Sequence, residues 1–184
     1  MGHLELAQPW WVNLLVAVPL LCLFGLRKGL EIQKATLVVS GLFGAAFGFV
    51  EAAVVIYLRA ATGLVPQPYA VDQQLQFANH LSRQLLTVEA GREIATIVML
   101  VCVAVLAGKR IKERVALFLW VFAFWDLLYY FGLWLWVRWP MSLTTPDVLF
   151  LIPTPWYAQV WFAYLVSGLT IVAIAISARE RHCS

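Results

Sequence analysis

The sequence predicts an all-α integral membrane protein: a single domain, residues 1–184, that forms a bundle of five membrane-spanning helices. Composition indicates this class, because 62% of the residues are hydrophobic, only 12% are charged and the mean hydropathy is +0.82. A soluble domain has about 25% charged residues. Since each span needs about 20 predominantly apolar residues, the length of the chain suits five or six spans joined by short loops.

Five apolar stretches are the candidate spans. They cover approximately residues 10–26, 35–58, 88–107, 115–137 and 156–177. Each is bounded by charges, proline or glycine, which commonly occur at helix ends. The first stretch is short enough to be compared with a signal peptide, but the first 26 residues contain no Lys or Arg. We therefore expect a retained helix.

Two of the segments that connect these stretches have sequence patterns that predict local structure. Apolar residues recur at helical spacing from Asp72 to Leu86, with Asp72 as a possible N-cap, which predicts an interfacial helix before span three. The segment 139–156 before span five contains four prolines around the apolar run Val148 to Ile152. This pattern fits either an interfacial loop or a re-entrant cap that dips into the bundle.

The basic residues predict the orientation. Nine of the thirteen Lys and Arg residues fall beside one side of the predicted bundle, between spans one and two, between spans three and four, or after span five. The positive-inside rule then places the N-terminus outside and the C-terminus in the cytoplasm, in a plasma membrane of the bacterial inner-membrane type. Basic loops beside a membrane also account for the formal net charge of +3, so no nucleic-acid partner is expected.

Charged residues inside or at the edge of the spans are the main functional signal. They are Glu51, Glu89, Arg92, Glu93 and Asp126. A charge deep in a bilayer costs about 3 kcal/mol or more unless it finds a partner or water. Residues three and four apart share a helix face, so these side chains can converge from three helices. We expect one pocket that opens toward the outer surface.

Small residues indicate which face of span two packs against protein. Gly44 and Gly48 share the helical stripe of Glu51. Such small-xxx-small patterns allow another helix to approach closely. The stripe therefore predicts that Glu51 points into the bundle.

The residue types of this pocket suggest their roles. The four carboxylates Glu51, Glu89, Glu93 and Asp126 are candidate ligands for a hard divalent cation such as Mg²⁺, Ca²⁺ or Mn²⁺. Candidate catalytic groups are Asp126 and Glu93 as acid or base and Arg92 as an anion clamp. Candidate ligand-binding residues are Tyr129, Tyr130 and Asp147. No histidine lies within a predicted span, so a haem is not expected.

The pair Glu89 and Glu93, with Arg92 between them, resembles in spacing the Glu-x-x-x-Glu element of polyprenyl-pyrophosphate phosphatases. The resemblance covers five residues, and the second, glycine-rich motif of that family is absent. It implies a chemistry in which carboxylates hold a metal while Arg92 binds a phosphorylated lipid head group.

Several functions remain open at this level. The first is an outward-facing pocket that binds a metal cation or a polar ligand, with or without catalysis. The others are proton- or cation-coupled transport through the carboxylates, and a non-catalytic subunit of a larger membrane complex. A structural alternative is that the charges only hold helices together. Expected partners are membrane lipid and other membrane subunits or further copies of this chain.

Overall fold

The computed structural model describes residues 5–26, 30–61 and 83–179, and most of them are helical. Four described helices are long and apolar enough to cross a membrane: α2 (Lys34–Ala61), α4 (Arg83–Ala107), α5 (Ile111–Val137) and α6 (Val160–Arg179). A shorter apolar helix precedes them; it is the 3₁₀-helix η1 (Trp10–Ala17) continued by α1 (Val18–Leu26). These elements coincide with the five predicted stretches to within a few residues.

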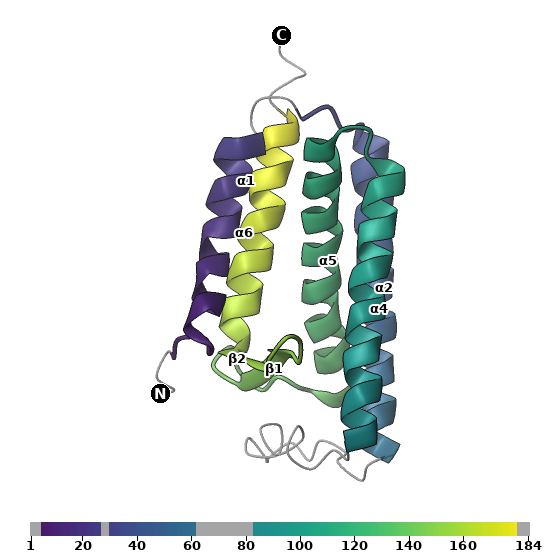
Figure 1. Cartoon of the computed structure of the whole chain (residues 1–184), viewed down its shortest axis with the longest axis vertical. Helices are drawn as coiled ribbons and strands as arrows, with labels where there is room; N and C mark the ends of the chain where they lie inside the picture. Colours follow the sequence, from purple (N-terminus) through teal and green to yellow (C-terminus); the bar gives the residue numbers. More distant parts are fainter. Residues whose placement is uncertain (1–4, 27–29, 62–82, 180–184) are drawn as a thin grey trace.

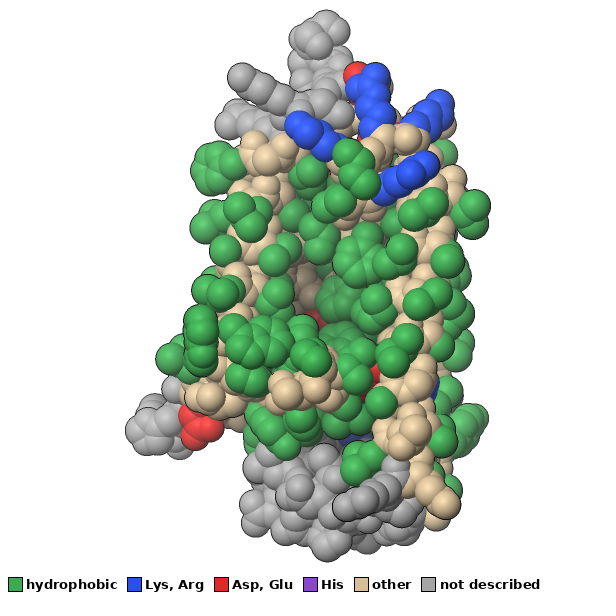
Figure 2. All heavy atoms as spheres, in the orientation of Figure 1, with side chains coloured by type: hydrophobic (Ala, Val, Ile, Leu, Met, Phe, Trp, Pro, Cys, Tyr) green, Lys and Arg blue, Asp and Glu red, His purple; other side chains and the backbone are tan. Residues whose placement is uncertain are grey.

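The helices run side by side and alternate in direction (Figure 1). The N-terminal end of η1, the end of α2 and the start of α4 lie at one end of the bundle, which we call the hairpin end. The end of α1, the start of α2 and the α4–α5 connection lie at the other, which we call the basic end. Lys and Arg side chains gather at the basic end in Figure 2, where the described basic residues are Lys34, Lys109, Arg110, Lys112 and Arg114.

A β-hairpin gives the hairpin end its name and corrects the all-α prediction. Strand β1 (Pro146–Phe150) pairs with antiparallel β2 (Trp156–Gln159), with an irregularity between Val148 and Phe150. Gln8 and Tyr157 exchange two backbone hydrogen bonds of 2.7 Å, which attach the N-terminal segment to β2. The proline-rich segment is therefore an ordered cap, and the last long helix begins at Val160, four residues later than predicted.

The predicted interfacial helix falls mainly outside the described residues. Of the segment from Asp72 to Leu86, the structure describes only the part from Arg83 onward, and that part is the first turn of α4.

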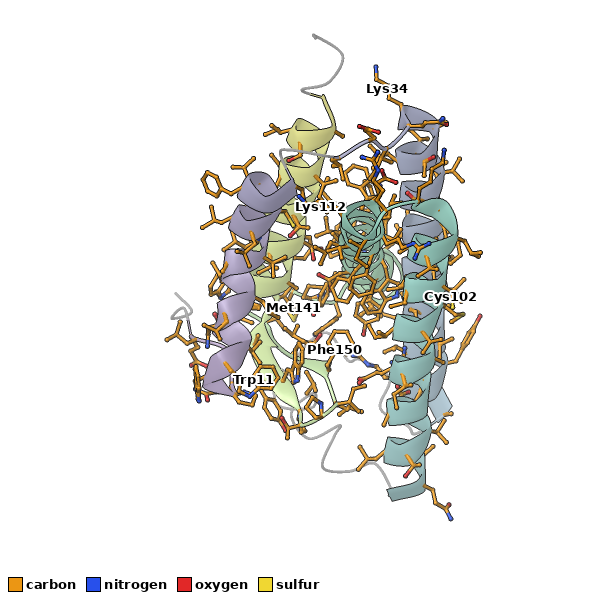
Figure 3. All side chains as sticks on the ribbon, turned by 45° about the horizontal axis from the view of Figure 1, so that its top comes forward. Trp11, Lys34, Cys102, Lys112, Met141 and Phe150 are labelled. Carbon is orange, nitrogen blue, oxygen red and sulfur yellow. The ribbon has the colours of Figure 1, made fainter. Side chains whose placement is uncertain are left out.

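Helix α5 is central, because α2, α4 and α6 all pack against it. The contact with α2 is close: a Cβ added at Gly48 would overlap the Trp125 carbonyl, and one added at Gly44 would lie 2.5 Å from the Val121 carbonyl. The glycine stripe thus faces protein, as predicted, and it brings Glu51 against α5. Figure 3, tilted by 45° from the view of Figure 1, labels Cys102 on α4, which is exposed.

Candidate functional site

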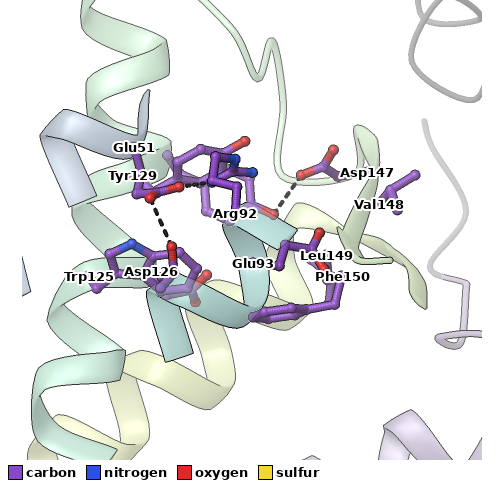
Figure 4. A pocket seen from close by; sticks show the side chains of 12 residues that line it. Glu51, Arg92, Glu93, Trp125, Asp126, Tyr129, Asp147, Val148, Leu149 and Phe150 are labelled. Atoms are coloured by element: carbon purple, nitrogen blue, oxygen red, sulfur yellow. Dashed lines mark hydrogen bonds and ion pairs between the residues drawn. The ribbon is translucent and has the colours of Figure 1, made fainter. Parts of the chain in front are cut away.

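A polar cavity of about 60 Å³ lies toward the hairpin end, between α2, α4, α5 and strand β1 (Figure 4). A single water needs about 10–15 Å³, so the cavity has room for a few waters or one small polar group. Its polar lining consists of Glu51, Arg92, Glu93, Thr96, Asp126, Tyr129, Tyr130 and Asp147. Helical periodicity explains the convergence, since each of the three helices turns one polar stripe toward this point.

Arg92 joins α4 to α2. Its guanidinium forms an ion pair with Glu51 and a second one, at 2.8 Å, with Glu89 on its own helix. Thr96, one turn further along α4, donates a hydrogen bond of 2.9 Å to the other oxygen of Glu51. The Glu51 carboxylate is therefore neutralised and oriented by α4, although it is only 4% exposed.

Glu93 attaches the hairpin to the bundle. Both of its carboxylate oxygens accept the backbone N–H of Leu151, at 3.1 and 2.9 Å. Leu151 directly follows β1, so the carboxylate fixes the point at which the strand leaves the sheet. Glu93 is thus a structural anchor that also lines the cavity.

Asp126 has a different environment. Ser167 on α6 donates a hydrogen bond of 2.6 Å to its Oδ2 atom. Among the described residues no Lys, Arg or His pairs with Asp126, and its Oδ1 atom accepts no hydrogen bond. The nearby indole Nε1 of Trp125, which also lines the cavity, is buried without a hydrogen-bond partner in the described part of the chain. The cavity wall therefore includes a carboxylate that accepts a hydrogen bond through only one of its two oxygens.

Asp147 closes the cavity from the hairpin side. It is buried and accepts a hydrogen bond of 2.8 Å from the Tyr130 hydroxyl. Burial raises the pKa of Asp147 to about 6, against the opposing effects of the Arg59 charge and of the Tyr130 hydrogen bond. Arg59 itself is buried near the end of α2, with its guanidinium 5.0 Å from the centre of the Trp139 ring.

The structure brings together seven of the eight predicted site residues. Glu89 is the exception: it bonds to Arg92 beside the cavity and does not line it. Sequence reasoning missed Arg59, Ser167 and the Trp125 indole. Arg59 had a signal, because it lies eight residues after Glu51 and hence on the same helical stripe. Ser167 had none, since a single serine in an apolar span is common.

The predicted metal site finds no support in this arrangement. In the part of the chain that the structure describes, no three His, Cys, Asp or Glu side chains are grouped as they would be around a metal ion. The physical reason is that the carboxylates are held by different partners: Glu51 by an arginine and a threonine, Glu93 by a backbone amide, and Asp126 by a serine.

Formal charge at the site is unbalanced. Among the described residues, five carboxylates lie in or beside the cavity (Glu51, Glu89, Glu93, Asp126 and Asp147), against the two arginines Arg59 and Arg92. Arg92 is already committed to two of these carboxylates.

Comparison of the chain with protein-family models, with curated proteins and with solved structures finds no match. The geometry of the site is therefore the basis for a functional proposal.

Proposed function

We propose that the chain is a multi-pass membrane protein with five spans and that its polar cavity binds a small cationic group from the outer side. The observation that carries the ligand proposal is Asp126, an acidic side chain on the cavity wall that has a free oxygen and no basic partner among the described residues.

The first segment is long enough to be a span because part of it is a 3₁₀-helix. Eight 3₁₀ residues at about 2.0 Å each and nine α-helical residues at about 1.5 Å each reach about 30 Å. The hydrocarbon core of a bilayer is about 30 Å thick. Five spans with the basic end in the cytoplasm agree with the positive-inside rule, so the hairpin end is the outer one.

A cationic ligand suits the charges around the cavity better than an anionic one. A phosphate would need a free arginine fork, yet Arg92 is engaged with Glu51 and Glu89. An ammonium group has three N–H donors and needs only carboxylate or hydroxyl acceptors. Asp126 supplies an acceptor of this kind, and the volume of the cavity suits a group of that size. A protonated primary amine therefore fits better than a phosphorylated head group or a hard metal ion.

Transport across the whole membrane is the weaker alternative. Toward the basic end the bundle is filled by a cluster of buried apolar side chains that includes Leu100, Leu117 and Ile174. The buried Ser40 and Ser177 there bond to carbonyls of their own helices. The described residues thus give no polar path from the cavity to the basic end, which favours a binding pocket with one opening.

Calorimetric titration of the purified protein in lipid nanodiscs tests the proposal, with methylammonium chloride as the probe. We expect saturable binding that Asp126→Asn weakens about tenfold or more, because a charge-assisted hydrogen bond contributes about 1.5–3 kcal/mol. Asparagine can still accept the hydrogen bond from Ser167, so the fold should persist. Magnesium chloride and sodium phosphate serve as comparison probes.

The matched control is Glu5→Gln, which removes an exposed carboxylate from the same end of the molecule. It should leave methylammonium affinity unchanged. Absence of saturable binding to the wild type, or equal affinity in the Asp126→Asn protein, would refute the proposal. If magnesium binds more tightly than methylammonium and its binding also depends on Asp126, the ligand of the cavity is a metal cation and not an amine.

A further inference from the structure

A second, larger cavity lies beside the polar one. It has a volume of about 310 Å³ and is lined from η1, α1, α4, α5, α6 and the hairpin, by residues that include Leu15, Ile97, Phe122, Ala123 and Val166. The face drawn in Figure 2 is hollowed between the α1–α6 pair and α4, and hydrophobic side chains surround the hollow. This face would be turned toward lipid in a membrane.

The lining offers almost no polar group to an occupant. Its two hydroxyl side chains are engaged, since Ser167 donates to Asp126 and Thr170 donates to the Val166 carbonyl at 2.7 Å. Apolar cavities do not hold water well, and an empty cavity loses the dispersion contacts of its walls. Within a bilayer the available filler is hydrocarbon.

The two cavities adjoin and share part of their walls. Phe150 lines both of them. Ser167 lines the apolar cavity and bonds to Asp126, which lines the polar one. The polar and the apolar site are therefore close enough for one molecule that passes Phe150, with its polar end beside Asp126 and its hydrocarbon chain among the apolar side chains.

We propose that the apolar cavity holds the hydrocarbon chain of an amphipathic ligand whose cationic end occupies the polar cavity, with a long-chain primary amine as its simplest form. This inference rests on the function proposed above and specifies the ligand class. Burial of a methylene contributes about 0.8 kcal/mol, or about fourfold in affinity, as long as the cavity still accepts it.

A series of methylammonium, butylammonium and octylammonium chlorides tests this, titrated into the protein in nanodiscs. For the wild type we expect octylammonium to bind more than about tenfold tighter than methylammonium, given the methylene contribution. Ala123→Leu fills the apolar cavity and should remove most of that gain, while methylammonium affinity stays unchanged. Ile97→Phe is a second filling variant, from α4 instead of α5.

Ala46→Leu is the matched control, because Ala46 is exposed on α2 and lines neither cavity. It should behave as the wild type, and it corrects for partition of the longer amines into lipid. The apolar cavity does not hold the hydrocarbon chain if amine affinity fails to rise with chain length. The same conclusion follows if the rise is equal in Ala123→Leu, Ile97→Phe and Ala46→Leu. Failure of methylammonium itself to bind would instead refute the proposed function on which the inference rests.

Discussion

Arg92 is the residue on which the polar network depends. It is held between Glu51 of α2 and Glu89 of α4, and all three side chains are largely removed from solvent. Removal of one partner from such a group leaves charge buried without compensation. The arrangement therefore stabilises the α2–α4 contact and keeps Arg92 from binding an anion.

We expect Arg92→Gln to lower the free energy of unfolding by about 3 kcal/mol, the lower end of the range for a buried pair, because Arg92 retains some exposure. Thermal unfolding followed by tryptophan fluorescence measures the change. Glu31→Gln is the comparison, since the Glu31–Arg110 pair at 3.7 Å is exposed and should contribute less than about 1 kcal/mol. Equal effects of the two substitutions would contradict this account.

Asp147 should make stability depend on pH. Its folded pKa of about 6 lies above the ordinary value of 3.8, so the native state binds more protons than the unfolded state between these values. Stability contributed by Asp147 should therefore fall as pH rises from about 4 to about 6. Melting temperatures measured across this range should decline less in Asp147→Asn than in the wild type, and an identical decline would exclude Asp147 as the source.

The side-chain contacts of the site were only partly predictable from the sequence. Convergence of Glu51, Glu93 and Asp126 followed from charge cost and helical periodicity, which are local properties. The pairing of each carboxylate did not follow, because Ser167 and the Leu151 amide come from elements distant in sequence. The four carboxylates that were predicted to bind one metal ion are therefore held by separate partners.

At the scale of elements, the β-hairpin is the part of the fold that the hydrophobic pattern of the sequence did not predict. Val148–Ile152 and Trp156–Gln159 are short runs, and periodicity cannot distinguish a short strand from a loop or a helix end. Their structure comes from pairing with each other, from the Gln8–Tyr157 bridge and from the Glu93 anchor. The long helices were predictable because length and hydropathy alone define them.

Glu93→Leu should release the hairpin from α4. Without the carboxylate the Leu151 amide loses its acceptor, so hydrogen exchange at Leu151 and across β1 should accelerate about tenfold or more, given a loss of 1.5–3 kcal/mol for a charged hydrogen bond. Exchange followed by mass spectrometry measures this. Glu89→Gln, one turn away and without a bond to the hairpin, is the control; unchanged protection in Glu93→Leu would show that the hairpin is held by pairing alone.

At the scale of the whole molecule, the alternating helices and the basic end underlie the proposed topology, with the N-terminus outside and the C-terminus in the cytoplasm. Reporter fusions at the two termini test it: a reporter active only in the cytoplasm should work at the C-terminus and fail at the N-terminus. Cysteines introduced at Thr144 and Lys109 should be labelled by an impermeant reagent only at Thr144. An externally accessible C-terminus would mean that the protein has the opposite orientation in the membrane, with the cavity open to the cytoplasm.

The central claim is that Asp126 faces a wet cavity in which a cationic group binds. A high-resolution cryo-electron microscopy map of the protein in lipid nanodiscs with octylammonium tests this most directly. The account predicts density between α2, α4 and α5 within hydrogen-bond distance of Asp126 Oδ1, continued by chain density beside Phe150 and Ala123. A cavity closed by side chains, or an Asp126 paired with a basic residue of this chain, would contradict it.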